Sequence, residues 1–406
     1  MPRRGTRQIL RQYRLQIQQN GIKFVSCLSS FLFCKTSYVL NYIHARLVSI
    51  IYFTEVRILF EKLKSAKHFY IFCSLVTAVS LLTAGFVMAN PPETIAVERN
   101  QEGKDFIKWV DFNVCYTALS DCLKYDVGTY GTEKHTSWLD LLACLASKNG
   151  GTFSGYKSSD LKKITDELEK GTLLTDITGK LKAFPYYREA YEGVLGGFVG
   201  EFEIEKDDGN GGKTVEKKYG LKAFSPIAKG YSYSDFDDFG SSRSYGFKRK
   251  HLGHDMMGSV GTPICAVESG YVECVGWNQY GGWRIGIRSF DKKRYYYYAH
   301  LRKDHPYNDM YEGKIVTAGE VIGYLGMTGY STKENVNNIN TPHLHWGMQL
   351  IFDESQKDAL AEIWIDIYAI TKLLDQNKSA VYRPEGEKEF YRKYQMYEPN
   401  IEVFAD

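Results

Sequence analysis

The sequence predicts an α+β multidomain protein: an N-terminal membrane helix, a mainly helical accessory domain and then an antiparallel all-β domain. Three observations lead to this fold class. An uncharged, mostly apolar run occupies residues 69–89, apolar residues recur at three- and four-residue spacing through 105–200, and short β segments with glycine turns begin near residue 260. The chain has 406 residues, enough for two domains and further segments.

Residues 1–68 form a basic N-terminal segment, and residues 69–89 are predicted to be a transmembrane or signal helix. A run of about 20 apolar residues is long enough to span a bilayer. Three lysines between residues 62 and 67 precede the run, so the positive-inside bias predicts that the rest of the chain is extracytoplasmic. Val87-Met88-Ala89 has the form of a signal-peptidase site, which leaves open both a single-pass membrane anchor and a secreted cell-wall protein.

Composition excludes some functions. The formal net charge is only +3, so we expect no nucleic-acid partner. The eight cysteines include no C-x-x-C pair, which argues against a cysteine zinc knuckle or a thioredoxin-like site. If Ser269-Gly270 is a two-residue turn, Cys265 and Cys274 lie opposite each other and a cross-strand disulfide is predicted.

Residues 95–235 are predicted to be a mainly helical accessory domain. Amphipathic spacing predicts helices over 109–123, 137–147 and 158–170. Asp207–Gly212 has the composition of a hairpin tip, and the segment 227–246, rich in Ser, Gly, Tyr and Asp, is interpreted as a linker into the next domain.

Residues 236–352 are predicted to be an antiparallel β domain. Alternating β segments separated by glycines occur at 262–267, 271–277, 283–288, 295–300, 321–325 and 343–350. The remaining residues, 353–406, are expected to form a short helix over 363–374 and a polar tail from residue 384.

Histidines concentrate in the β domain: six of the nine lie between residues 251 and 345. In His343-Leu-His345, strand alternation puts both imidazoles on one face. His251-Leu-Gly-His-Asp255 places an imidazole and a carboxylate a few residues apart. Two histidines and a carboxylate with an open fourth position are typical of hydrolytic zinc sites. Each motif alone also fits ordinary strand residues, but together with His300 in one domain they favour a metal centre.

Five sequence blocks occur in order along this domain. They are His251-Leu-Gly-His-Asp255, Gly261-Thr-Pro-Ile-Cys-Ala-Val-Glu-Ser-Gly-Tyr-Val272, Tyr298-Ala-His-Leu301, Val316-Thr-Ala-Gly-Glu-Val-Ile-Gly-Tyr-Leu-Gly-Met-Thr-Gly329 and Thr341-Pro-His-Leu-His345. They resemble the lysostaphin-type (LytM-like) zinc metalloendopeptidases of bacterial cell-wall turnover, with the resemblance covering about residues 245–352. Met327, where that family often has Ser, and a long loop at 330–340 are departures that touch no ligand position.

The resemblance implies a duplicated hybrid motif of antiparallel strands, a Zn²⁺ cofactor and residue roles. His251, Asp255 and His345 match the metal ligands. His300 and His343 match two catalytic histidines that handle protons and stabilise an oxyanion. His254 is expected on the surface or behind the ligands, on the side opposite His251.

The resemblance also implies a function: a zinc endopeptidase that hydrolyses peptide bonds of peptidoglycan through a metal-activated water. The expected partners of this protein are a peptidoglycan peptide, as the substrate, and the membrane, through the predicted 69–89 helix. A non-catalytic scaffold of the same fold in a cell-envelope or sporulation complex is the main alternative. A third hypothesis is that 95–235 has its own wall-binding or glycan-cleaving activity, for which Glu167, Glu189 and Glu192 are available carboxylates.

Aromatic residues surround the histidines in sequence. Tyr295–Tyr298, Trp283 and Trp346 are candidates for lining a peptide-binding groove, with alternate tyrosines filling the core.

Overall fold

The computed structural model describes residues 97–99, 105–245, 247–357, 361–399 and 401. The described residues from Arg99 onward form one compact unit. The predicted basic segment 1–68 and the predicted membrane helix 69–89 lie outside the described residues. Within the part that is described, no helix combines the length and the apolar character needed to cross a bilayer.

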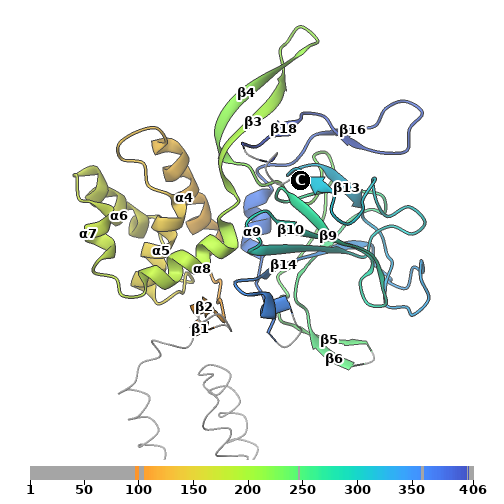
Figure 1. The fold of residues 1–406 in the computed structure, drawn as a ribbon, viewed down its shortest axis with the longest axis horizontal. Coiled ribbons are helices and arrows are strands. Elements are labelled where there is room, and N and C mark those ends of the chain that lie inside the picture. The colour runs from red at the N-terminus through yellow and green to blue at the C-terminus, as the bar shows by residue number, and fades with distance from the viewer. Residues whose placement is uncertain (1–96, 100–104, 246, 358–360, 400, 402–406) are drawn as a thin grey trace, which may run out of the picture. The chain divides into compact units, whose positions relative to one another are not determined.

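Helices cluster in the first part of the described chain (Figure 1). They are α4 Tyr116–Thr129, α5 Trp138–Asn149, α6 Ser158–Glu169, α7 Leu174–Thr178 and α8 Phe184–Leu195. The Ser137 side chain caps α5 by accepting a hydrogen bond from the Leu139 amide, and Gly150 ends this helix at a left-handed φ of 63°. The predicted helices near 137–147 and 158–170 are therefore present.

The helix predicted over 109–123 begins seven residues later than expected, at Tyr116. Before it, Val110, Phe112 and Val114 are buried while the residues between them are exposed. This two-residue period is that of extended chain, and the apolar side chains enter the core. The spacing of these residues is compatible with both a helix and a strand, and packing against the core favours the extended conformation.

One antiparallel sheet dominates the second part of the chain. Its strands follow the order β12-β9-β10-β11-β14-β15, and β7 also pairs with β14. Their bounds are β7 His254–Met257, β9 Gly270–Asn278, β10 Gly282–Ser289, β11 Arg294–Ala299, β12 Ile315–Val316, β14 His343–Leu350 and β15 Ile363–Trp364. The prediction of an antiparallel β domain is confirmed.

The predicted disulfide between Cys265 and Cys274 is wrong. Cys265 ends β8 Pro263–Cys265, which pairs with β13 Val321–Tyr324 in a separate two-stranded sheet, whereas Cys274 lies opposite Gly286 in the large sheet. Both cysteines are free. The chain crosses from one sheet to the other at residues 266–269 instead of forming a tight hairpin.

Two further segments differ from expectation. The 227–246 segment is not a bare linker: Ile227 pairs with Ile264 and Ser234 with Met257, and β5 Ser242–Tyr245 forms a hairpin with β6 Phe247–Lys250. The predicted polar tail also packs back. Its strand β18 Met396–Tyr397 pairs with β3 Val199–Asp207, and Met396 is buried.

The β3–β4 hairpin extends away from the large sheet, with its tip at the predicted Asp207–Gly212 turn (Figure 1). The remaining bounds are β1 Val97–Arg99, β2 Asp105–Ile107, β3 Val199–Asp207, β4 Lys213–Leu221, η1 Glu354–Lys357, α9 Tyr368–Leu374, β16 Val381–Tyr382 and β17 Tyr391–Arg392. The helix predicted over 363–374 is therefore shorter, because β15 takes its first residues.

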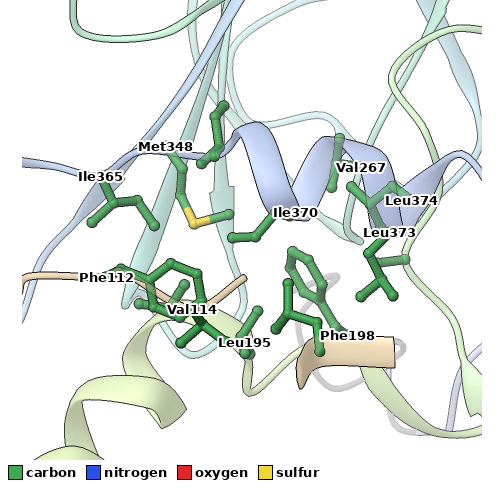
Figure 2. Packing of buried hydrophobic residues seen from close by; sticks show 14 of the residues in the cluster. Phe112, Val114, Leu195, Phe198, Val267, Met348, Ile365, Ile370, Leu373 and Leu374 are labelled. Carbon is green, nitrogen blue, oxygen red and sulfur yellow. The ribbon is translucent and has the colours of Figure 1, made fainter. Parts of the chain in front are cut away.

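One apolar cluster joins the helices to the sheet. Figure 2 shows Phe112, Leu195 and Phe198 from the helical part facing Met348 on β14 and Ile370 on α9. All five are buried. The helical region and the sheet therefore share one core, and burying this apolar surface stabilises both.

A buried arginine reinforces this junction. Arg294, at the start of β11, donates hydrogen bonds to the Glu192 and Gly193 carbonyl oxygens at the end of α8, at 3.2 and 2.9 Å. Its other nitrogens reach the carboxylates of Glu268 and Asp291. We call Arg294, Glu268, Asp291 and these carbonyl groups the clamp.

Candidate metal centre

Strands β7 and β14 bring together residues that lie 90 positions apart in the chain. His345 is directly opposite Asp255 in the ladder, and His343 is opposite Met257. His251 precedes β7 and is held through its backbone, since its amide bonds the Ser241 carbonyl at 2.9 Å. The motif glycine, Gly253, leaves space for His345, because a Cβ there would lie 2.5 Å from the His345 Nε2 atom.

The atoms of the three predicted ligands converge. His251 Nε2 is 3.0 Å from Asp255 Oδ1 and 3.1 Å from His345 Nδ1, and His345 Nδ1 is 2.8 Å from the same Asp255 oxygen. Ligand atoms about 2.0–2.1 Å from a tetrahedral zinc ion lie roughly 3.3 Å apart. The observed separations are slightly shorter, so the three side chains would need to move apart by a few tenths of an ångström to hold zinc. The site then has two imidazole nitrogens and one carboxylate oxygen as ligands, with a fourth position open.

The electrostatics of the cluster favour an ionised carboxylate. Although burial opposes ionisation, hydrogen bonds from His251 and His345 hold the pKa of Asp255 far below its usual range. Burial lowers the pKa of His345. Burial acts in the same sense on His251, but the hydrogen bond to Asp255 and nearby carboxylates raise the pKa of His251 overall.

His300 and His343 lie beside this triad. The two rings are 4.8 Å apart between centroids, and His343 Nε2 is 3.7 Å from Asp255 Oδ1. Each Nδ1 meets a backbone carbonyl oxygen: that of Thr328 for His300 at 2.9 Å and that of Thr341 for His343 at 2.8 Å. A carbonyl can only accept, so each Nδ1 carries a proton and, in the neutral ring, Nε2 is the basic nitrogen.

His300 is held in an unusual backbone conformation. Its φ is +62°, in the left-handed region that non-glycine residues rarely adopt. Burial, together with the neighbouring His343 and His345, lowers the pKa of His300 well below its ordinary value. A neutral imidazole at this position is the form that accepts a proton.

Sequence reasoning missed Asp238, which lies in the segment interpreted as a linker. Its Oδ1 accepts a hydrogen bond from His251 Nδ1 at 2.8 Å, on the side of the ring away from the triad. The Arg243 guanidinium bonds the other Asp238 oxygen and comes within 3.6 Å of Asp255 Oδ2. Metal-bound histidines commonly donate their second N–H to a carboxylate, so the acidic residues upstream of His251 were a usable signal.

His254 is turned away from the triad, as predicted, but it is buried rather than on the surface. Its Nε2 contacts Asp235 Oδ2 at 2.7 Å, and its ring stacks on Tyr368 with centroids 5.4 Å apart. Asp235 and Asp238 therefore each hold one histidine of the H-x-G-x-D motif.

Strand β11 divides its tyrosines between two faces. Tyr296 and Tyr298 are fully buried, and Tyr298 lies opposite the equally buried Trp346. Tyr295 and Tyr297 are partly exposed on the face that carries His345, and Tyr297 is in ring contact with His345 at 6.0 Å. The division of tyrosines is as predicted, but Trp346 belongs to the core and not to a groove.

Trp283 also lies on the core side of the sheet, because it shares the face of the buried Ile285. In the helical region, Glu167 and Glu189 are exposed and Glu192 pairs with Arg188. The three carboxylates are thus surface groups of two helices, as solvated helix faces usually are.

Comparison with known proteins identifies relatives of the β domain. Residues 249–358 match the family described as Peptidase family M23. The L-Ala–D-Glu endopeptidase of Bacillus subtilis (strain 168) is 40% identical over 123 residues, which cover 30% of this chain and 36% of that protein. Lysostaphin of Staphylococcus staphylolyticus is 40% identical over 97 residues, which cover 24% of this chain and 18% of lysostaphin.

Among solved structures, the catalytic domain of lysostaphin from Staphylococcus simulans is similar at 30% identity and a TM-score of 0.27, covering 34% of this chain and 92% of that domain. The alignments with the two curated relatives span about a third of the length of the first and about a fifth of the second.

Proposed function

We propose that this protein, whose residues 249–358 are a peptidase family M23 domain, is a zinc-dependent endopeptidase that hydrolyses peptide bonds of bacterial peptidoglycan. The observation that carries the proposal is the convergence of His251, Asp255 and His345, whose facing atoms lie 2.8–3.1 Å apart. One relative at 40% identity and another at 38% identity are named as endopeptidases, which supports peptide hydrolysis over other zinc chemistry.

In this proposal His251, Asp255 and His345 hold the zinc ion. Bound zinc supplies Lewis acidity toward a scissile carbonyl and makes a water molecule a stronger acid. Asp238 fixes the ring of His251, because the hydrogen bond at Nδ1 leaves Nε2 free to face the ion.

His300 and His343 are the proposed catalytic histidines. With both Nδ1 protons given to backbone carbonyl groups, each Nε2 is available to the reacting groups. The lowered pKa of His300 suits a neutral ring that accepts a proton from water. His343, near Asp255, is placed to return a proton to the leaving amine or to hydrogen-bond the developing oxyanion.

The proposed site of action is outside the cytoplasm, at the cell membrane or cell wall. Charge asymmetry around residues 69–89 supports an extracytoplasmic location, as single-pass anchor or secreted protein.

The experiment is zinc stoichiometry combined with digestion of purified peptidoglycan, using residues 90–406. We expect one zinc per chain and release of soluble fragments, whose masses identify the cleaved bond. Zinc binding without hydrolysis would instead favour a scaffold built on the same fold. A protein that binds no zinc after reconstitution would remove the basis of the proposal.

A further inference from the structure

A second charged group shares the face of the sheet with the metal centre. In the ladder between β10 and β11, Ile285 lies opposite Tyr298, and both are fully buried on the core side. Arg284, one residue earlier, is therefore on the opposite face, with Tyr297 and His345.

The register also gives the separation. Strand β11 lies between β10, which carries Arg284, and β14, which carries His345. Neighbouring strands are about 4.8 Å apart, so the two backbones are separated by roughly 10 Å. An extended peptide advances about 3.3 Å per residue, so Arg284 is within reach of a substrate residue about two or three positions from the bond beside the zinc ligands.

Among the residues that the structure describes, Arg284 has no acidic partner, unlike Arg288 and Arg294 of the same sheet. Arg288 on the same strand binds Glu273 through two nitrogens, and Arg294 binds Glu268 in the same way. In the described part of the chain, Arg284 forms no ion pair. Its side-chain contact is from Nη1 to the Cys274 Sγ atom at 2.7 Å, and its Nε is buried without a hydrogen-bond partner.

An unpaired guanidinium that is partly removed from water is costly. A thiol is only a weak acceptor and does not neutralise the charge. The group is still partly exposed, so a ligand can reach it. The planar donor fork of arginine matches a carboxylate, which it binds through two hydrogen bonds.

We propose that Arg284 is a specificity-determining residue that binds a free carboxylate of the substrate peptide, so the enzyme prefers acidic peptides. The predicted effect on peptide cleavage rests on the proposed function, whereas the predicted binding of a carboxylate by Arg284 does not. The relative named for cleavage at L-Ala–D-Glu acts beside a residue with a carboxylate, which is the substrate chemistry that this site fits.

The test compares the tripeptide L-Ala-D-Glu-L-Lys with the same peptide carrying a carboxamide in place of the free glutamate carboxylate. We expect wild-type kcat/KM to be roughly 10- to 100-fold higher for the carboxylate form, the range for hydrogen bonds to a charged group. Arg284→Met should remove this preference, because only hydrolysis of the carboxylate peptide should become slower. In the wild type, the preference should weaken at high salt, which screens the charges.

Cys274→Ala is the matched control, because it removes the present contact of Arg284 but keeps the charge. It should retain the preference. Equal rates for both peptides in wild type, or an equal loss on both in Arg284→Met, would overturn the inference.

Binding separates this inference from the proposed function. After zinc is removed with a chelator, titration calorimetry should give tighter binding of the carboxylate peptide to wild type than to Arg284→Met. If that difference is found without cleavage by the zinc-loaded protein, the carboxylate site stands and the enzyme proposal fails. If the protein cleaves both peptides with no selectivity in rate or binding, the enzyme proposal stands and the carboxylate site fails.

Discussion

The clamp and the candidate metal centre are both buried charged clusters, and they use their charges in opposite ways. In the clamp, each nitrogen of the Arg294 guanidinium has an acceptor among Glu268, Asp291 and two carbonyl groups of α8. In the metal centre, one carboxylate oxygen and two imidazole nitrogens face each other at 2.8–3.1 Å. A cluster with matched donors and acceptors stabilises the fold, whereas a carboxylate oxygen and two imidazole nitrogens that converge form a site for a cation.

The largest expected effect separates two histidines of one strand. His345→Ala removes a ligand from a three-ligand site, so it should lose both zinc and peptidoglycan hydrolysis. His343→Ala keeps the ligands, so it should retain zinc but lose roughly 10²–10⁴-fold in rate, the usual size of an acid–base contribution. Zinc stoichiometry and hydrolysis rate are measured on the same preparations.

His300→Ala should behave like His343→Ala in this assay. A zinc-free His343→Ala together with a zinc-loaded His345→Ala would reverse the two assignments. Full activity in both would move the catalytic site elsewhere in the chain.

Changes in the clamp should lower the free energy of unfolding and not zinc binding. Arg294→Met leaves the buried Glu268 carboxylate without its positive partner, although the Tyr296 hydroxyl still donates a hydrogen bond to it. Removing one partner of a buried ion pair typically costs about 3–5 kcal/mol. Urea unfolding at neutral pH measures the loss. The double variant Arg294→Met/Glu268→Gln should recover part of the loss, because the buried charge of Glu268 is removed as well. A single variant as stable as wild type would contradict the structural role of the clamp.

Asp238 combines both features, because it accepts a hydrogen bond from His251, one of the candidate metal ligands. Asp238→Asn should weaken zinc affinity by roughly 10- to 100-fold, the usual range for a carboxylate behind a metal-bound histidine. Asp235→Asn is the control, since Asp235 holds His254 in the same way at 2.7 Å but His254 faces away from the triad. Competition with a chromogenic chelator measures affinity; equal losses in both variants would mean that the effect is structural.

The smallest effect is a pH dependence of stability without metal. Because burial lowers the pKa of His300 below the unfolded value of about 6.5, the unfolded chain binds more protons below that pH. The contribution of His300 is therefore fully present above pH 6.5 and is lost as the pH falls. His300→Asn, which tolerates a positive φ, should flatten the stability curve between pH 7 and 5; an unchanged slope would show that His300 does not stay neutral.

The convergence of the candidate metal-centre residues was predictable because short local motifs determine which side chains share a face. His343 and His345 share a face by strand alternation, and the H-x-G-x-D motif sets His251 and Asp255 four positions apart. Their pairing across 90 residues follows once both segments are assigned to neighbouring strands.

What could not be predicted depends on contacts distant in sequence. Asp238 falls in a segment with the composition of a linker, because its role exists only when residues 238–241 run beside His251. The predicted hairpin at Ser269-Gly270 is absent for a related reason. Strand β8 pairs with the distant β13, and β9 forms its hairpin with the following strand, β10. Likewise, the segment around Phe112 is extended and not helical because Phe112 is buried in the core.

The clamp bears on how such a protein evolves. A peptidase domain that ended cleanly at its own surface could be exchanged between chains by recombination as an independent module. Here a crossover near residue 236 would bare the apolar surface around Met348 and Ile370 and deprive Arg294 of its two α8 carbonyl acceptors. The helical region and the large sheet are therefore expected to be inherited together and to change together.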